Sequence, residues 1–227
     1  MEKGGLFQDL RILFTSVSEK EKTSLQELCR GQGAAVLSTA TPNDPPHVIV
    51  TRRVGSPKYL AVLRRHPRTP VVAPEWISNS LSSGKRIPYS QYCVGACYGL
   101  KVCLSGFSAQ EKARLANLIQ SNGGVHSPSL TKQCTHLISN SCESEKYKFA
   151  QKYGITCACA QWLIDSGQVG WCKDESQYPV NGRSNKGVAQ TDNIDNKHLA
   201  NHSRASLLRR SSSAAVTDSQ TLRYVCC

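Results

Sequence analysis

The stretches LFTSVSEKEK (residues 13–22) and CLSGFSAQEK (residues 103–112) share one local pattern at an offset of 90 positions. In each, an apolar run leads through a hydroxyl residue to a serine, and a glutamate follows that serine three positions later. This serine and glutamate form the capping-box signature of a helix start, and a lysine comes directly after the glutamate. The pattern predicts a buried strand followed by a capped helix, and this unit occurs twice in the chain.

Three further blocks repeat in the same order, at offsets that fall from 89 to 86 as loops change length. The pairs are PPHVIV (45–50) with CTHLIS (134–139), SPKYLAV (56–62) with SEKYKFA (144–150), and VVAPEWIS (71–78) with TCACAQWLI (156–164). We interpret the chain as two copies of one domain, with His47 and His136 at equivalent positions and in a fold role.

The second copy predicts the element order βαββαβα. Strands are expected over residues 100–105, near Val125, and over 136–139 and 155–159, with helices after Ser108, over 145–152 and around Trp162. Strands that alternate with helices imply a parallel sheet covered on both faces. The expected fold class is α/β, with two βαββαβα domains, each a four-stranded parallel sheet flanked by helices.

The limits of the domains follow from where the pattern begins and ends. Residues 6–92 form the expected first domain, residues 98–180 the second, and residues 181–227 a disordered, basic tail rich in serine and asparagine. In this tail, two arginines precede three candidate phosphorylation sites for a basophilic kinase, Ser211, Ser212 and Ser213. An ordinary polar tail is the alternative interpretation.

Apolar residues at helical spacing indicate the buried face of the first helix in each copy. These residues are Leu25, Leu28 and Cys29 in the first copy, and Leu115, Leu118 and Ile119 in the second. Trp76 and Trp162 lie among aliphatic neighbours in the last helix of each copy. We therefore expect both rings to pack in the core and not to form a stacking platform for bases.

Charge points to an anionic partner. The 227 residues carry a formal net charge of +12, and residues 1–92 alone hold 13 basic and 7 acidic side chains. Such a balance suits nucleic acid or a phosphorylated protein, and the charge does not choose between them.

Other compositional features exclude several classes of protein. No apolar run approaches the ~20 residues that cross a bilayer, and the first residues lack the apolar stretch of a secretory signal. We therefore expect an intracellular protein with reduced cysteines and no membrane partner. Its cysteines and histidines show no zinc-finger spacing, so we expect no metal; the pairs considered are Cys93 with Cys97, Cys157 with Cys159, and His198 with His202.

Four features together resemble the BRCT domain, here in tandem. They are the glycine pair after the first helix, the strand that opens with Thr-His, the helix that contains Lys-Tyr, and the tryptophan of the last helix. The second copy is similar to multi-BRCT checkpoint scaffolds of the topoisomerase-II-binding-protein type.

This resemblance implies a phosphate-binding set in each copy. The family uses a hydroxyl residue at the end of the first strand, a basic residue seven positions later and a lysine that opens the second helix. The corresponding residues are Ser105, Lys112 and Lys146 in the second copy, and Thr15, Lys22 and Lys58 in the first. The family's glycine after the hydroxyl is present as Gly106, whereas the first copy has Ser16.

The resemblance further implies a non-catalytic scaffold that reads phosphoserine or phosphothreonine peptides in DNA-damage, DNA-repair and replication-checkpoint assemblies of the nucleus. No cofactor and no small-molecule substrate are expected, and no nucleotide-binding or hydrolase motif is present. Two alternatives remain open: phosphate-independent pairing of BRCT domains, and direct binding of DNA. The second would use basic residues clustered in the first copy, namely Arg52, Arg53, Arg64, Arg65 and Arg68.

Overall fold

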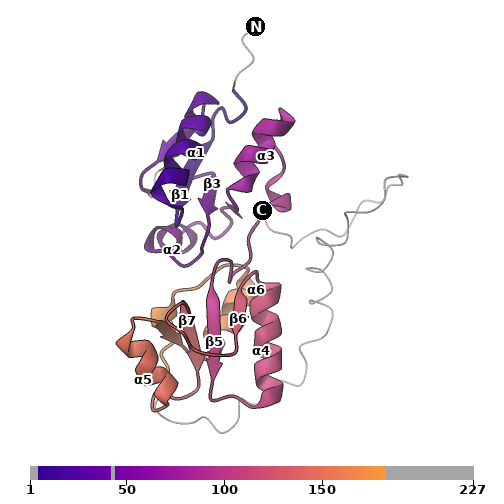
Figure 1. The fold of residues 1–227 in the computed structure, drawn as a ribbon. Coiled ribbons are helices and arrows are strands. Elements are labelled where there is room, and N and C mark those ends of the chain that lie inside the picture. Colours follow the sequence, from indigo (N-terminus) through magenta and orange to yellow (C-terminus); the bar gives the residue numbers. More distant parts are fainter. Residues whose placement is uncertain (1–4, 42–43, 182–227) are drawn as a thin grey trace, which may run out of the picture.

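The computed structural model describes residues 5–41 and 44–181, and it forms two repeats of four parallel strands with helices (Figure 1). The predicted tail with Ser211, Ser212 and Ser213 lies outside the described residues from position 182 onward, as do His198 and His202. In the described ranges, no helix has the length and apolar character that crossing a membrane requires.

The first repeat runs from β1 to the short 3₁₀ helix η1. Its elements are β1 (Arg11–Thr15), α1 (Glu19–Gly31), β2 (Ala35–Leu37), β3 (Val48–Thr51), α2 (Pro57–Leu63), β4 (Val71–Val72), α3 (Glu75–Ser83) and η1 (Tyr89–Gln91). The sheet order is β2-β1-β3-β4, and every pair is parallel. The strands read as short apolar runs because helices cover the sheet.

The second repeat has the same order of elements and ends in a second 3₁₀ helix. Its elements are β5 (Lys101–Ser105), α4 (Ala109–Ser121), β6 (Val125–Ser127), β7 (His136–Ser139), α5 (Glu145–Lys152), β8 (Thr156–Ala158), α6 (Ala160–Val169) and η2 (Glu175–Gln177). The sheet order is β6-β5-β7-β8, again fully parallel. The fold class predicted from the sequence is therefore confirmed.

The strand register corrects one equivalence between the repeats. The second residue of each repeat's first strand pairs with Val48 in one sheet and with His136 in the other. His47 therefore corresponds to Thr135, and the prediction that His47 and His136 are equivalent was wrong by one position.

His47 and Thr135 nevertheless perform the same local task. The backbone N–H of Arg11 donates to Nδ1 of His47 at 3.2 Å, and the backbone N–H of Lys101 donates to the Thr135 hydroxyl at 3.0 Å. Each side chain thus satisfies the first amide of its repeat's leading strand, where a parallel neighbour offers no partner. A histidine has this role in the first repeat and a threonine in the second. Matching His47 to His136 by residue type therefore misaligned the two strands by one position.

The predicted tryptophans lie in the core, and one predicted core residue does not. Trp76 and Trp162 are fully buried, and each indole N–H donates to a backbone carbonyl at 2.8 Å. Leu118 is half-buried against the core, but its counterpart Leu28 is 48% exposed. The reason is local: α4 packs closely against α6, while α1 has no comparably close contact with α3.

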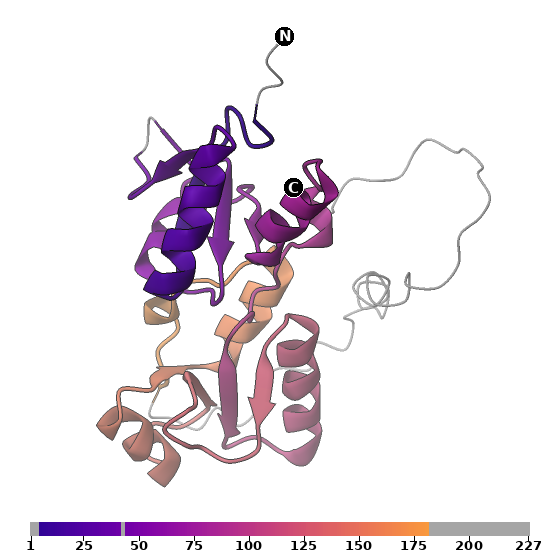
Figure 2. The ribbon, with the colours of Figure 1, turned by 45° about the horizontal axis from the view of Figure 1, so that its top comes forward.

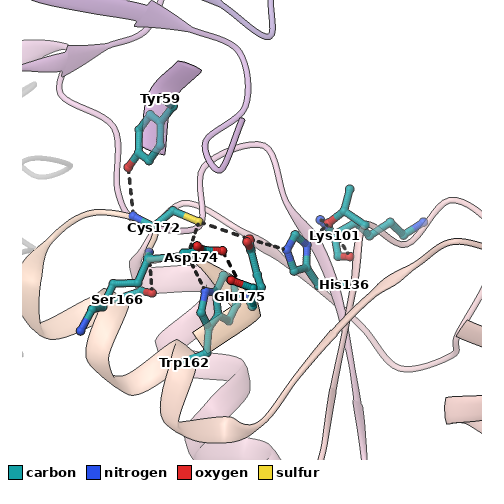
Figure 3. A network of polar contacts seen from close by, with 11 residues as sticks. Tyr59, Lys101, His136, Trp162, Ser166, Cys172, Asp174 and Glu175 are labelled. Atoms are coloured by element: carbon teal, nitrogen blue, oxygen red, sulfur yellow. Dashed lines mark hydrogen bonds and ion pairs between the residues drawn. The ribbon is translucent and has the colours of Figure 1, made fainter. Parts of the chain in front are cut away.

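The two repeats share a hydrophobic cluster that runs across their boundary. Helix α2 of the first repeat faces the second repeat, and its Tyr59 is 1% exposed (Figures 1 and 2). The Tyr59 hydroxyl accepts the backbone N–H of Cys172 at 2.9 Å (Figure 3). Arg64 at the end of α2 forms an ion pair with Asp174. The two repeats therefore pack directly against each other as one body.

Gly99, in the segment between η1 and β5 that joins the two repeats, lies very close to the backbone of the first repeat. This glycine has a φ of 75°, and a Cβ at that position would collide with the backbone carbonyl of Arg52. Nearby, the amide of Val54 donates to the carbonyl of Tyr98 at 3.1 Å. A residue without a side chain is required here because the left-handed backbone and the close approach both exclude a Cβ.

A buried polar network holds the end of the second repeat. The ring of His136 stacks on Trp162 with centroids 5.1 Å apart and an interplanar angle of 8°, and its Nε2 lies 3.1 Å from Oε1 of Glu175 (Figure 3). Glu175 begins η2, the segment beside Cys172 at the boundary between the repeats. This network ties the sheet of the second repeat to its contact with the first.

Candidate functional site

Both predicted hydroxyl residues end the first strand of their repeat. Thr15 and Ser105 are 6% and 8% exposed, at the carboxyl edge of each sheet, beside the last residues of β3 and β7. The residue that follows has a left-handed backbone in both repeats, with a φ of 51° at Ser16 and 81° at Gly106. The first repeat therefore has the same left-handed turn, although it has Ser16 in place of the glycine.

The predicted helix lysines lie one turn into α1 and α4. Ser18 and Ser108 are the N-caps, and Lys22 and Lys112 are the fourth residues of the helices. A reciprocal capping box forms only in α4, where the Glu111 carboxylate accepts the backbone N–H of Ser108 at 2.8 Å. This hydrogen bond lowers the pKa of Glu111.

The capping box predicted for α1 is only half formed. The Ser18 hydroxyl accepts the amide of Glu21 at 3.4 Å, but the Glu21 carboxylate turns to Arg52 instead of returning to Ser18. The Nη2 atom of Arg52 lies 2.5 Å from Glu21, and its Nη1 forms a second ion pair with Glu75. These carboxylates raise the pKa of Arg52, so a cation with two anionic partners sits beside α1.

The second helices bring the remaining predicted lysines to the same edge. Ser56 and Ser144 cap α2 and α5, and each accepts the amide three residues later at 3.2 Å. Lys58 and Lys146 are the second residues of these helices. In parallel sheets the helix that follows a strand begins at the carboxyl edge, so both helix N-termini point toward Thr15 or Ser105.

We call Thr15, Ser16, Lys22 and Lys58 site 1, and Ser105, Gly106, Lys112 and Lys146 site 2. In site 1 the Thr15 hydroxyl and both lysine ammonium groups have protein partners. The Thr15 hydroxyl lies 2.5 Å from that of Ser56, Lys22 lies 3.3 Å from Glu19, and Lys58 donates to the Ser38 carbonyl at 2.9 Å. The hydroxyl and the two lysines form no hydrogen bond with one another in the described residues.

In site 2 the same groups have few protein partners. Among the described residues, no hydrogen bond involves the Ser105 hydroxyl, and the exposed ammonium of Lys112 has no acidic partner. Lys146 is half-buried, with its Nζ 3.9 Å from the Cys103 thiol. Burial raises the pKa of Cys103, although the Lys146 charge acts in the opposite direction, so the thiol stays neutral.

The residue directly after the third strand of each repeat was not among the predicted phosphate-binding residues. Arg52 has this position in the first repeat and Asn140 in the second. Asn140 donates from its amide to the carbonyl of Gly106, and a Cβ on Gly106 would collide with its amide oxygen. The strand register pairs Arg52 with Asn140, whereas the sequence match of residues 45–50 with 134–139 would pair Arg52 with Ser141. The error of one position in that match therefore hid this pair in the sequence.

The arginines proposed for DNA binding do not form one free patch. Arg52 pairs with Glu21 and Glu75, and Arg64 pairs with Asp174 at the boundary between the repeats. Only the three remaining members stay exposed without an acidic partner in the described ranges: Arg53, Arg65 and Arg68. The basic run in the sequence is thus partly neutralised by the fold.

No group of three or more histidine, cysteine, aspartate or glutamate residues in the described part of the chain could hold a metal ion. The nine described cysteines form no disulfide. What both sites offer is a hydroxyl, a left-handed turn with its backbone N–H, helix N-termini and ammonium groups. This combination suits an anion with several oxygen acceptors.

Two family models match the two repeats. Residues 2–81 match the BRCA1 C Terminus (BRCT) domain, and residues 100–162 match the twin BRCT domain. The matched segments contain β1 to α2 and most of α3 in the first repeat, and β5 to β8 with Trp162 in the second.

Relatives with curated descriptions are checkpoint and interaction proteins. The chain is 28% identical over 166 residues to the S-M checkpoint control protein rad4 of Schizosaccharomyces pombe, an alignment that covers 69% of this chain and 25% of that protein. It is 34% identical over 113 residues to PAX-interacting protein 1 of Mus musculus, covering 48% of this chain and 11% of that protein. The chain thus spans a quarter or less of the length of these relatives.

A solved structure resembles three quarters of this chain. The crystal structure of Rad4 BRCT1,2 in complex with a Crb2 phosphopeptide has 25% sequence identity and a TM-score of 0.65, and the match covers 75% of this chain and 97% of that chain. A second complex, with a Mdb1 phosphopeptide, matches with a TM-score of 0.67 at 24% identity, and it supports the fold. The chain belongs to the BRCT family, as a tandem of two BRCT domains similar to those of checkpoint scaffolds.

Proposed function

We propose that this chain is a non-catalytic adaptor that binds phosphoserine or phosphothreonine peptides of DNA-damage and replication-checkpoint proteins. The observation that supports it best is the recurrence of one arrangement in both repeats: a strand-end hydroxyl, a left-handed residue, a capped helix and two lysines. A single lysine at a helix start would carry little weight, because surface lysines are commonly solvated.

The chemistry of the arrangement suits a phosphate monoester. The hydroxyl and the neighbouring backbone N–H would donate to phosphate oxygens, and two ammonium groups would balance a charge of about −2. The neutral analogue of the same peptide lacks both the charge and the acceptors, so binding would depend on phosphorylation.

The relatives support the proposed partner class. Rad4 BRCT1,2, whose structure matches 75% of this chain, was crystallised with a Crb2 phosphopeptide. By analogy we assign this chain to checkpoint and repair assemblies in the nucleus, and we assign it no enzymatic activity of its own, as is typical of BRCT domains.

Of the two sites, site 2 is the stronger candidate. Its Ser105 hydroxyl and Lys112 ammonium have no acidic or hydroxyl partner to release in the described residues, whereas site 1 must break contacts to Ser56 and Glu19. Binding at site 2 therefore needs less rearrangement.

The test is fluorescence anisotropy with matched phosphorylated and unphosphorylated peptide libraries. Replacement of Lys146 by alanine should weaken phosphopeptide binding about tenfold or more, because one charge-assisted hydrogen bond is worth about 1.5–3 kcal/mol. Lys58→Ala should have a smaller effect. The matched control is Lys148→Ala, which removes an exposed lysine two positions further along α5 whose ammonium pairs with Glu145.

Phosphate-dependent binding that Lys146→Ala reduces and Lys148→Ala leaves intact would support the proposal. Binding of equal strength with and without phosphate, unchanged in both lysine variants, would overturn it. That result would favour phosphate-independent pairing of BRCT domains.

A further inference from the structure

The amino-terminal edge of the second sheet lies opposite site 2 and carries a surface that the proposed function does not use. Lys101 and Val125 are the first residues of β5 and β6, Lys132 precedes β7, and Lys152 and Tyr153 close α5 before β8. We call these five residues the amino-edge surface. In a parallel sheet, all residues that precede the strands gather at one edge, so they line the four strands in turn.

An aromatic ring and two ammonium groups form the centre of this surface. Tyr153 is 40% exposed, and Nζ of Lys132 lies 4.4 Å from its ring centroid, with Nζ of Lys152 at 5.7 Å. Phe149 supports the ring from within the helix, with centroids 4.5 Å apart. Two cations thus share one ring, and they repel each other unless an anion lies nearby.

No carboxylate balances this charge in the described residues. Lys101 bonds to the neutral side chain of Gln133 at 3.1 Å, and Lys132 and Lys152 contact only Tyr153. The paired or capping carboxylates of the second repeat lie elsewhere: Glu111 caps α4, Glu145 pairs with Lys148, Asp165 with Lys173, Asp174 with Arg64 and Glu175 with His136. The amino-edge surface is therefore electropositive.

The corresponding edge of the first repeat is arranged differently, although Arg65 and Arg68, which precede β4, are also exposed there without an acidic partner in the described residues. Arg11, the counterpart of Lys101, forms an ion pair with Asp44 at 2.9 Å. Among the described residues, what is particular to the second repeat at this edge is the exposed aromatic ring with two ammonium groups beside it.

Size and exposure indicate an extended ligand. Four strands about 4.8 Å apart make an edge of about 14 Å, which is long enough for several units of a linear polymer. Val125, at one end of the edge, is 59% exposed, the largest exposure of the bulky apolar side chains in the described chain, and Tyr153 is at the other end.

We infer that the amino-edge surface binds single-stranded nucleic acid, with the three lysines on its phosphates and a base stacked on Tyr153. Positive charge interleaved with an exposed aromatic ring is the arrangement that recognises single strands without regard to sequence. An ammonium that leaves the ring for a phosphate frees the ring for a base, so the two contacts support each other. An acidic peptide would satisfy the charges but would leave the ring without a stacking partner.

The experiment measures anisotropy of a labelled oligothymidylate of 15 nucleotides with a 5′-hydroxyl, binding to the full chain over a series of salt concentrations. Lys132→Gln with Lys152→Gln should weaken binding about tenfold and reduce the slope of log K against log salt by about 1.4, since each lost phosphate contact accounts for about 0.7. Tyr153→Leu should weaken binding about fivefold or more, and Tyr153→Phe less than about twofold.

The matched control is Lys85→Gln with Lys148→Gln, which removes the same charge from exposed positions off this edge. It should change affinity by less than about twofold, although the chain as a whole is basic. The Lys146→Ala variant of site 2 should bind the oligonucleotide normally, so this inference and the proposed function can fail separately.

Equal losses in the edge and control variants would overturn the inference, because they would mean that net charge alone determines binding. Displacement of the oligonucleotide by polyglutamate at equal charge concentration would overturn it in favour of an acidic peptide. Amide chemical-shift changes in the wild-type chain that concentrate on the amino-edge surface would support it without any substitution.

Discussion

At site 1 the hydroxyl, the helix lysine and the nearby arginine already have protein partners, whereas at site 2 the hydroxyl and the helix lysine have none in the described residues. The backbone of the two sites is nevertheless alike, including the left-handed residue after the strand. The difference lies in a few side chains, above all Arg52 against Asn140. A repeated fold can thus preserve the shape of a site while the surrounding charges decide how readily it accepts an anion.

The largest expected losses of stability come from replacing the two buried tryptophans, and the two losses should differ in which repeat they loosen. Trp76→Ala and Trp162→Ala should each lower the free energy of unfolding by about 3–5 kcal/mol, because each leaves a large cavity. Trp76 packs against Phe7 and Tyr89 within the first repeat, but Trp162 belongs to the cluster that both repeats share. Urea unfolding with hydrogen exchange should therefore show Trp162→Ala loosening α2 of the first repeat as well.

If Trp76→Ala increased exchange in the second repeat as strongly, the asymmetry of the shared cluster would be contradicted. Substitution of either tryptophan by phenylalanine serves as the milder control, since it keeps most of the ring volume but loses the indole hydrogen bond.

An exchange of the residues after the strand-end hydroxyls should give the next largest effect. Gly106→Ser should lower the free energy of unfolding by about 1–2 kcal/mol, because the left-handed backbone disfavours a side chain and Asn140 would have to move. Ser16→Gly should raise it by up to about 1 kcal/mol, since it relieves that strain at a φ of 51°. Thermal denaturation measures both, and equal effects of the same sign would contradict the backbone argument.

Removal of a carboxylate should sharpen the contrast between the sites. In a Lys146→Ala background, where site 1 alone would read phosphopeptide, Glu21→Gln frees Arg52 of one partner and should raise affinity about threefold, equivalent to about 0.7 kcal/mol. The matched change Glu111→Gln, in a Lys58→Ala background, removes the charge from the capping box of α4 without releasing an ion-paired arginine, and it should give no gain. Peptide titrations check both, and a gain from Glu111→Gln would contradict the role given to Arg52.

The smallest effect should appear in acid. Burial alone would raise the pKa of Glu75, but the hydrogen bond and charge of Arg52, together with a backbone hydrogen bond, outweigh burial and hold the pKa below its usual value. The group therefore stabilises the fold above its unfolded-state pKa, and this stability is lost as pH falls through the folded value. Because the pair is partly exposed, the contribution should stay below about 1 kcal/mol.

Urea midpoints measured between pH 5 and pH 3 test this directly. Arg52→Asn, which copies the residue of the second repeat, should flatten the pH dependence in that range, and Arg53→Asn is the neighbouring control. A pH dependence unchanged by Arg52→Asn would contradict the assignment.

The sequence was sufficient to predict the fold because each repeat restates the same local signals. Strand β7 and helix α5 have the predicted limits, at His136–Ser139 and Glu145–Lys152. Serines that cap helices and apolar runs between them depend on neighbours in sequence, so a single chain shows them.

Features that depend on distant packing were predicted less well. Leu28 looks like a core residue by its spacing, but no helix lies close enough to cover it. The Glu21 carboxylate fits a capping box, but Arg52, 31 residues away, attracts it instead. Site 1 and site 2 both have a hydroxyl residue and two lysines in sequence, and three-dimensional neighbours such as Ser56 and Glu19 decide which of these groups already have partners.

The hydrogen bond between Tyr59 and Cys172 and the buried cluster around it have a consequence for avidity. Since the repeats are fixed to each other, the distance between site 1 and site 2 is fixed as well. A ligand with two phosphates at the matching separation would bind its second phosphate at a high effective concentration, while the same phosphates at another separation would gain nothing. The affinity for a partner would then depend on the spacing of its phosphorylated residues and not only on their number.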